Sequence, residues 1–414
     1  MDAVRVLHVT TAFPRDENDP ITPWMVELIR SLRDRGVDAQ VLTSAYRGDG
    51  DHEVHGIPVH RFRYAPARWE TLTHDETVPD RIRRSAGYAS LVPLYLAGGT
   101  LSSLRRGLTG EWDVVHVHWP MPHSLFGSAL RLASGGRTAV VSSYYSVELT
   151  WVKRRMPWLR PFLRWTTRSA DAMTANSSAT AEKVREYTDR EVRVVPSPAP
   201  FDESAGPDAE TREPFEDDGP LRLLFVGRLV ERKGVEYLVR ALPRILEERS
   251  AVVTVVGEGE WRPRIEAAAR EAGVEERVEL TGYIPAERLE SLYRTCDAFV
   301  LPAVVDEKGD TEGLGVVLLE ALLFERPVIA SGVGGIVDIV RDGETGWRVP
   351  PRDPEALAEA VLDAASDPDR AREIAARGRR YVLDNFSSDA IAESLEGIYR
   401  AAASARRDDG GNAG

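Results

Sequence analysis

The fold is decided by a stretch in which an apolar run passes into a cationic loop, Leu223-Leu224-Phe225-Val226-Gly227-Arg228-Leu229-Val230-Glu231-Arg232-Lys233-Gly234. The apolar run has the length of a buried strand and ends at Gly227, and a helical pattern of apolar residues begins near Gly234. A strand, a loop and a helix in this order are typical of a parallel α/β sheet. Arg228 and Lys233 are therefore predicted in the loop at the carboxyl end of a strand, where open α/β sheets bind ligands.

These two cations match the chemistry of a diphosphate. A guanidinium fork binds two phosphate oxygens at once, and a lysine adds a compact positive charge. Because both residues are predicted in a loop, we expect their removal to lower turnover more than folding stability. A pair of solvated loop cations is the alternative that this segment allows when it is considered alone.

A second stretch places two carboxylates around a glycine turn, Asp310-Thr311-Glu312-Gly313-Leu314-Gly315-Val316-Val317-Leu318-Leu319-Glu320-Ala321. Glycines let backbone approach a ligand closely, and the free N–H groups of the helix that starts at Gly315 and Val316 favour an anion. Glu312 in the turn would meet a sugar, while Glu320, about two turns into the helix, would hold ribose hydroxyls. The arrangement suits a nucleoside diphosphate sugar; a solvated turn followed by an amphipathic helix is the alternative.

Both halves of the chain alternate strand and helix patterns, which is typical of parallel sheets. The expected strands are Val4–Thr10, Ala39–Thr43, Val114–His118, Thr138–Ser142, Leu221–Val226, Ala251–Val256, Val278–Thr281, Ala298–Leu301 and Pro327–Ala330. We therefore predict an α/β fold of two Rossmann-like domains that face each other across a cleft, in residues 1–200 and 220–385. Residues 201–219, which carry eight acidic side chains and one Arg, are predicted to form an exposed acidic linker. Residues 405–414 are predicted to be a disordered tail.

The glycine-rich motifs of the second half resemble those of glycosyltransferase family four. They are Gly227-Arg228-Leu229-x3-Lys233-Gly234, Glu312-Gly313-Leu314-Gly315-x4-Glu320, Gly334-Gly335-Ile336 and Asp342-Gly343-x2-Gly346. The stretches Leu7–Arg15 and Asp113–Trp119 resemble members that build polysaccharides and glycolipids. The resemblance implies a GT-B fold whose last helix, over residues 386–404, crosses back onto the N-terminal domain. It also implies retaining transfer of a hexosyl group from a UDP- or GDP-linked sugar to a saccharide or lipid-linked acceptor.

The resemblance also implies the site residues. Arg228 and Lys233 would stabilise the departing diphosphate and Glu312 would position the sugar, so these three are the predicted catalytic residues. The predicted donor-binding residues are Gly227, Glu320, Gly315, Val316, Tyr283, Ile284 and Gly257. The acceptor proton would pass to the leaving phosphate, so the resemblance implies no cofactor besides the donor substrate and no obligatory metal.

Two departures from the family pattern concern the acceptor side. The usual His-Gly pair is replaced by Tyr144 and Tyr145 within Ser142–Glu148, and Tyr144 stands about where the histidine would be. The usual glycine-rich acceptor loop is replaced by Asp19-Pro20-Ile21-Thr22-Pro23. The predicted acceptor or cleft residues are therefore His118, Tyr144 and Thr22. Glu148 is a further candidate for a missing polar contact.

Histidines and an acidic pair raise the question of a metal, and neither pattern predicts one. His116, His118 and His123 cluster in sequence, but no nearby carboxylate or fourth ligand completes a site. His118 at the end of its strand is expected to line the cleft, with a packed or capping histidine as the alternative. Asp49-Gly50-Asp51 lies in a polar, glycine-containing segment, which favours a solvated turn.

Composition bounds the location and partners. The 414 residues are 43% hydrophobic without a long uncharged apolar span, and a single cysteine excludes an intramolecular disulfide. The first residues lack the pattern of a signal peptide, so a cytoplasmic protein is expected and no nucleic-acid partner is predicted. The segment Trp151–Arg168 carries six cations and three Trp without an acid, which predicts contact with an anionic membrane at its inner face. Ordinary domain helices with solvated arginines are the alternative.

Two rival functions remain open from the sequence. A nucleotide-sugar epimerase has the same fold but needs acid and base residues in the N-terminal cleft, and none is identifiable there. A non-catalytic nucleotide-sugar-binding protein would be compatible with Tyr144, but it leaves the complete set of donor motifs unexplained.

Overall fold

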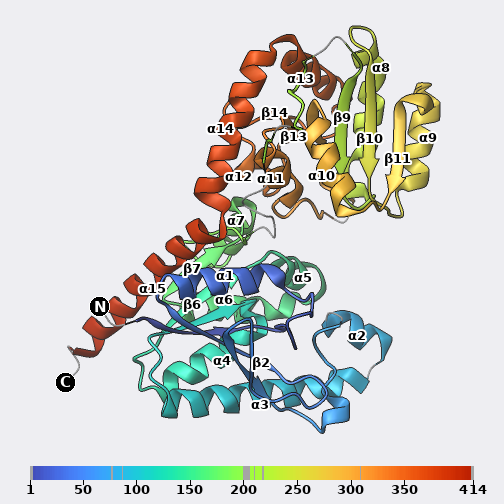
Figure 1. Ribbon diagram of the computed structural model, residues 1–414. Coiled ribbons are helices and arrows are strands. Elements are labelled where there is room, and N and C mark those ends of the chain that lie inside the picture. The colour runs from blue at the N-terminus through green and yellow to red at the C-terminus, as the bar shows by residue number, and fades with distance from the viewer. Residues whose placement is uncertain are drawn as a thin grey trace. The chain divides into compact units, whose positions relative to one another are not determined.

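The computed structural model describes residues 3–75, 78–85, 87–198, 206–208, 210–216, 219–307 and 309–411. They form two units, one comprising Met1–Asn176, Thr180–Pro200 and Ser388–Gly414, and the other Ser177–Ala179 and Phe201–Ser387. Each unit contains one sheet with helices on its faces (Figure 1). The predicted class, an α/β protein with two Rossmann-like units, is confirmed.

The N-terminal unit holds an eight-stranded sheet within the described residues, in the order β3-β4-β2-β1-β5-β6-β7-β8. All neighbouring strands are parallel except β3, which runs antiparallel to β4. The strands are β1 (Arg5–Val9), β2 (Asp38–Ser44), β3 (His52–Val54), β4 (Ile57–Phe62), β5 (Val114–His118), β6 (Ala139–Tyr144), β7 (Ala172–Ala175) and β8 (Arg193–Val194).

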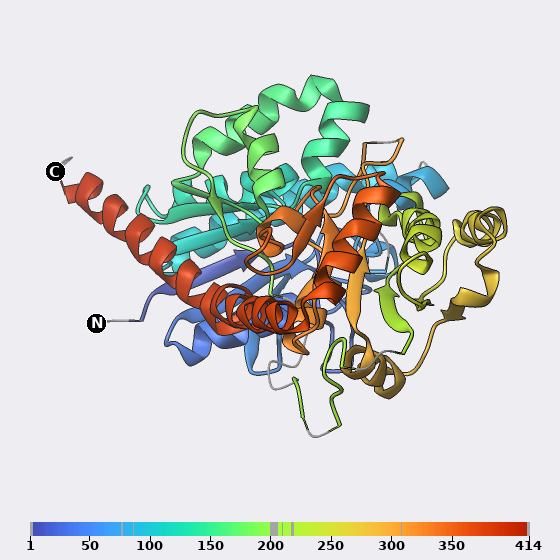
Figure 2. The same cartoon turned by 90° about the horizontal axis from the view of Figure 1, so that it is seen from above.

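Helices cover both faces of this sheet because its central strands are apolar on both faces. On one face, α1 (Pro23–Asp34) and α15 (Ser388–Gly411) lie side by side and pack on the sheet (Figures 1 and 2). On the other, α3 (Gly87–Thr109) and α4 (Pro120–Ala133) form a second core with the opposite side chains of the same strands. The shorter helices are α2 (Val78–Arg84), α5 (Val147–Arg155), α6 (Arg160–Ser169) and α7 (Ser178–Arg185), with 3-10 turns at Ala67–Trp69 and Pro157–Leu159.

The C-terminal unit holds a six-stranded parallel sheet within the described residues, in the order β11-β10-β9-β12-β13-β14. Its strands are β9 (Leu221–Val226), β10 (Ala251–Val256), β11 (Val278–Gly282), β12 (Ala298–Leu301), β13 (Val328–Ser331) and β14 (Trp347–Val349). Its helices are α8 (Val235–Leu246), α9 (Arg262–Ala272), α10 (Ala286–Thr295), α11 (Val316–Leu323), α12 (Ile336–Ile339), α13 (Pro354–Ser366) and α14 (Pro368–Phe386), with 3-10 turns at Glu231–Lys233 and Glu275–Arg277. The strand order reverses between β9 and β12, where such sheets bind ligands.

The structure differs in part from the expected linker and from the expected tail. Part of the expected acidic linker packs on the C-terminal unit, because Phe215 is buried and both its backbone N–H and the Arg212 guanidinium donate to Asp297 Oδ1, at 2.8 and 2.6 Å. The rest of that prediction, at residues 201–205, 209, 217 and 218, lies outside the described residues. The expected disordered tail is helical to Gly411, because Arg406 bonds Asp171 and Arg407 bonds Asp113; residues 412–414 lie outside the described residues.

No helix in the described part of the chain is long and apolar enough to cross a membrane.

Candidate active site

Glycines form the carboxyl edge of three neighbouring strands in the C-terminal unit. Gly227 follows β9, Gly257 follows β10 and Gly282 ends β11. A Cβ on Gly257 would lie 2.1 Å from the Gly227 carbonyl oxygen, so no side chain fits there. The Gly227 N–H donates to Val256 O at 3.0 Å, and the Gly257 N–H donates to Gly282 O at 2.9 Å. This edge of the sheet therefore presents backbone, which a ligand can approach closely.

The two predicted cations in the loop after β9 differ in burial. Arg228 is exposed, whereas Lys233 ends a 3-10 turn, Glu231–Lys233, and is buried. Gly234 then adopts φ 67°, and a Cβ there would lie 1.8 Å from Pro302 O. Because only glycine fits this close contact, the loop is fixed against the segment that follows β12, and Lys233 with it.

Lys233 and Glu312 form a largely buried ion pair. Lys233 Nζ lies 2.5 Å from Glu312 Oε2, and the two side chains are only 10% and 13% exposed. Arg232 Nη1 lies 3.6 Å from the same oxygen. The structure thus brings together two of the three predicted catalytic residues. Arg232 was missed by sequence reasoning, and its position beside Lys233 was the only signal for it.

The turn after Glu312 is supported by the glycine pair Gly334-Gly335. The Gly335 N–H donates to Glu312 O at 3.0 Å, and a Cβ on Gly334 would lie 2.0 Å from that oxygen. Gly315 has φ 89° and precedes α11, which begins at Val316. The glycines hold the Glu312 backbone in place and leave the N-terminal N–H groups of α11 beside it, an arrangement that favours an anionic ligand.

Glu320 lies on α11 and is held by a tyrosine that the sequence reasoning missed. The Tyr293 hydroxyl, on α10, donates to Glu320 Oε2 at 2.7 Å. Burial raises the pKa of Glu320, while the Tyr293 hydrogen bond and the nearby Lys233 charge lower it. The ammonium of Lys233 contacts the other predicted carboxylate, Glu312, directly.

Tyr283 and Ile284 follow directly after β11, at the same edge of the sheet as Gly257. The Tyr283 side chain is 77% exposed and Ile284 is half-buried. Their contact with a nucleotide base stays a prediction.

In the N-terminal unit, two predicted acceptor residues lie in the interior. Tyr144 is fully buried in a core formed with α5, α6 and β7, and its hydroxyl lies 2.9 Å from Thr166 Oγ1. The prediction that it lines a cleft is wrong, because its side chain faces the helical layer. His118 is also fully buried, with Nδ1 2.6 Å from the Tyr145 hydroxyl. It borders a small cavity of about 10 Å³.

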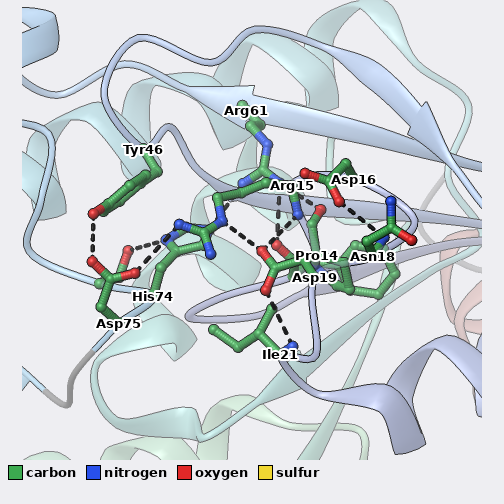
Figure 3. Close-up of polar contacts among 12 residues, drawn as sticks. Pro14, Arg15, Asp16, Asn18, Asp19, Ile21, Tyr46, Arg61, His74 and Asp75 are labelled. Carbon is green, nitrogen blue, oxygen red and sulfur yellow. Dashed lines mark hydrogen bonds and ion pairs between the residues drawn. The ribbon is translucent and has the colours of Figure 1, made fainter.

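Thr22 ends the loop between β1 and α1, which is held by polar contacts that the sequence reasoning did not find (Figure 3). Arg61 on β4 is buried and donates to Phe13 O at 3.1 Å and to Pro14 O at 2.7 Å. Arg15 Nε donates to Asp19 Oδ2 at 2.5 Å. The arginines thus take over the ordering of a loop that lacks the family's glycines. Thr22 is half-buried with φ 47°, and its role stays a prediction.

Comparisons with known proteins agree with this geometry. The family model described as Glycosyltransferase Family 4 matches residues 23–202, and the model described as Glycosyl transferases group 1 matches residues 208–381. The GDP-mannose-dependent alpha-(1-6)-phosphatidylinositol monomannoside mannosyltransferase of Mycolicibacterium smegmatis is 32% identical over 81% of this chain and 89% of that protein. An uncharacterized glycosyltransferase of Methanocaldococcus jannaschii, MJ1607, is 34% identical over 45% of this chain and 46% of its own length.

Among solved structures, Anabaena HepE in complex with UDP and glucose aligns with a TM-score of 0.64 at 18% identity, covering 96% of this chain and all of that one. Fold and matches together define a GT-B glycosyltransferase. The chain belongs to glycosyltransferase family 4, as its motifs predicted.

Proposed function

We propose that this glycosyltransferase transfers a hexosyl group, with retention, from a nucleoside diphosphate sugar to a saccharide or lipid-linked acceptor in cell-surface glycan synthesis. The observation that carries the proposal is the ion pair between the buried Lys233 and Glu312, which lies in the turn that precedes α11. GDP-mannose is the first donor to test, because the mycobacterial relative that matches over 89% of its length is named for it.

In the proposed reaction the acceptor hydroxyl oxygen forms a bond to the anomeric carbon. The bond between that carbon and the phosphate oxygen breaks, and its electron pair stays on the diphosphate. The hydroxyl proton passes to the leaving phosphate oxygen. Lys233 and Arg228 would stabilise the charge that develops on the diphosphate, which is the kind of electrostatic assistance that gives the largest rate effects.

Glu312 would act on the sugar side of the reacting bond. Once a diphosphate draws Lys233 toward itself, the Glu312 carboxylate loses part of its ion pair and can accept sugar hydroxyls and stabilise positive charge at the anomeric carbon. This chemistry requires neither a protein base nor a metal ion. Because no protein base is required, this chemistry is compatible with the loss of the histidine that the family usually carries near Tyr144.

Incubation with a panel of GDP- and UDP-sugars, with a chelator present, tests the proposal. We expect release of nucleoside diphosphate with one donor and formation of an α-linked product from the α-configured sugar, established by NMR. Glu320→Ala should weaken nucleoside diphosphate binding about 10- to 100-fold, since a charge-assisted hydrogen bond contributes about 1.5–3 kcal/mol. Arg270→Ala, an exposed cation on α9, is the matched control. Epimerised donor, or binding without turnover, would replace this proposal with one of the two rival functions.

A further inference from the structure

Three imidazoles gather inside the N-terminal unit, whereas the donor motifs belong to the C-terminal unit. His8 lies on β1, and His116 and His118 lie on β5, the neighbouring strand. His8 is the register partner of His116, and residues two apart on a strand share a face, so all three rings point to the same side of the sheet. Each is at most 1% exposed, and each offers one ring nitrogen within 4.8 Å of the others.

Two tyrosines orient the outer nitrogens of this cluster. The Tyr399 hydroxyl, on α15, lies 2.6 Å from His116 Nδ1, and the Tyr145 hydroxyl lies 2.6 Å from His118 Nδ1. When an Nδ1–H donates to a hydroxyl oxygen, the lone pair of that ring is on Nε2. His118 Nε2 lies 3.1 Å from His8 Nδ1, and His116 Nε2 lies 2.6 Å from Ser143 Oγ. Hydrogen bonds that fix the outer nitrogen are the usual support of metal-binding histidines.

The cluster also contains a buried polar atom without a hydrogen-bond partner among the described residues, and a small cavity borders two of its three histidines. His8 Nε2 makes no hydrogen bond within the described residues. A cavity of about 10 Å³ borders His116, His118, Ser143 and Tyr145. This volume is roughly that of one water molecule, or of one ligand in the open position of a three-histidine site.

We propose that His8, His116 and His118 bind one divalent zinc ion, with water in the cavity or the Ser143 hydroxyl as the fourth ligand. At a zinc–nitrogen distance of about 2.1 Å, two ligands of a tetrahedral ion lie roughly 3.4 Å apart. The pair His8 Nδ1 and His118 Nε2 is already at 3.1 Å, and one ring nitrogen of His116 lies within 4.8 Å of a ring nitrogen of each of the other two histidines. Imidazoles suit zinc and its neighbours, whereas magnesium and calcium require oxygen ligands.

The role of this ion is structural. It joins β1 to β5, and through Tyr399 on His116 it fixes α15 to the sheet. The ion does not contribute to the transfer chemistry. A short incubation with a chelator, which does not remove the buried zinc, therefore leaves turnover unchanged. Zinc binding to the folded chain instead raises the melting temperature of the N-terminal unit.

The test is metal binding by the whole chain after it has been stripped under mild conditions and dialysed with zinc. We expect about one zinc per chain by elemental analysis, and a cobalt-loaded form with the visible absorption of a tetrahedral site. Tyr399→Phe keeps the ring packed and removes the hydroxyl, so zinc should bind 10- to 100-fold more weakly. His8→Asn should abolish stoichiometric zinc.

The matched controls come from a second buried pair in the same unit, in which the Tyr95 hydroxyl lies 2.9 Å from His123 Nε2. Tyr95→Phe and His123→Asn should keep full zinc affinity. Circular dichroism verifies that each variant is folded. If His8→Asn does not fold, the zinc affinity of Tyr399→Phe compared with that of Tyr95→Phe tests the proposal. Substoichiometric zinc in the folded wild type, or equal affinity in those two tyrosine variants, would overturn the proposal and leave a hydrogen-bonded histidine core.

Discussion

Lys233 has two tasks, because the ammonium that is proposed to face a diphosphate also neutralises a buried carboxylate. We predict that Lys233→Met destabilises the protein by about 3 kcal/mol, since the largely buried Glu312 then loses its 2.5 Å partner and keeps Arg232 at 3.6 Å. This revises the expectation that a loop cation affects turnover alone. Adding Glu312→Gln should restore most of the lost stability but none of the turnover. Urea unfolding and donor turnover of the single and double variants check both statements; additive stability losses would contradict the pairing.

Glu148 offers a residue-level test of buried charge. Its side chain is buried at the start of α5, and burial raises the pKa of the carboxyl to about 7. The folded chain therefore holds a proton between about pH 4.5 and 7 that the unfolded chain has lost, so the contribution of Glu148 to stability decreases as pH rises through 7. We predict that Glu148→Gln raises the melting temperature at pH 8 more than at pH 5. An equal effect at both pH values would show an exposed carboxyl.

The backbone positions of the predicted donor motifs could be inferred from sequence, whereas the burial of the predicted acceptor residues could not. Glycine motifs report local backbone conformation, so Gly227, Gly257 and Gly315 occupy the expected strand ends and helix start. Tyr144 is the last residue of β6 and Tyr145 follows the strand, and from sequence alone either residue could line a cleft. Tyr293 contacts Glu320, which lies 27 residues further along the chain, and Arg61 contacts Pro14, which lies 47 residues earlier. A pattern among neighbouring residues does not reveal contacts over such separations.

At the scale of elements, the sequence patterns identified nine of the described strands and missed β3, β4, β7, β8 and β14. β4, which contains Pro58, His60 and Arg61, and the four-residue β7 lack an apolar run as long as Leu223–Val226 of β9. The length of α15 was underestimated for a related reason. Its last turns are polar, and they are ordered by partners that belong to distant strands and loops.

Asp171 is the main partner of those last turns, and it tests the docking of α15. Its Oδ1 accepts from Arg406 Nε at 2.9 Å, and its Oδ2 accepts from Arg131 at 2.6 Å and from the Val140 N–H at 2.7 Å. We predict that Asp171→Ala increases hydrogen exchange over residues 400–411 and destabilises the protein by about 3 kcal/mol. Asp389→Ala, whose carboxylate is exposed and pairs with Arg35, is the control and should change little. Unchanged exchange in the Asp171 variant would mean that apolar packing alone holds the helix.

At the scale of the whole molecule, charge is divided between the two halves. Residues 1–200 carry 26 Lys and Arg against 22 Asp and Glu, whereas the chain as a whole has a net charge of −13. The excess of cations includes the segment Trp151–Arg168, and the structure sorts its aromatic residues. Trp151, Phe162 and Trp165 are half-buried, with Phe162 and Trp165 in ring contact, whereas Trp158 is 69% exposed.

Four exposed arginines flank Trp158 in the sequence. Arg154 and Arg155 end α5, and Arg160 and Arg164 lie on α6. Trp favours the headgroup layer of a membrane, and each cation near an anionic surface contributes about 1 kcal/mol. We therefore predict that the chain binds anionic vesicles at low salt and that binding falls steeply as salt rises. Replacing Arg160 and Arg164 by Gln together with Trp158→Ala should abolish the binding.

Trp69→Ala provides the matched control, because Trp69 is also an exposed tryptophan of the N-terminal unit, 51% exposed with Arg68 stacked on its ring. It should leave vesicle binding unchanged in co-sedimentation.

A third set of variants addresses α3, where Leu94, Leu101 and Leu108 recur every seven residues and are 48%, 69% and 75% exposed. If replacing these leucines by Ser abolishes binding and the Trp158 set does not, the membrane contact is apolar and lies on α3. Equal failure of the wild type to bind anionic and neutral vesicles would contradict both surfaces and leave the arginines of α5 and α6 simply solvated.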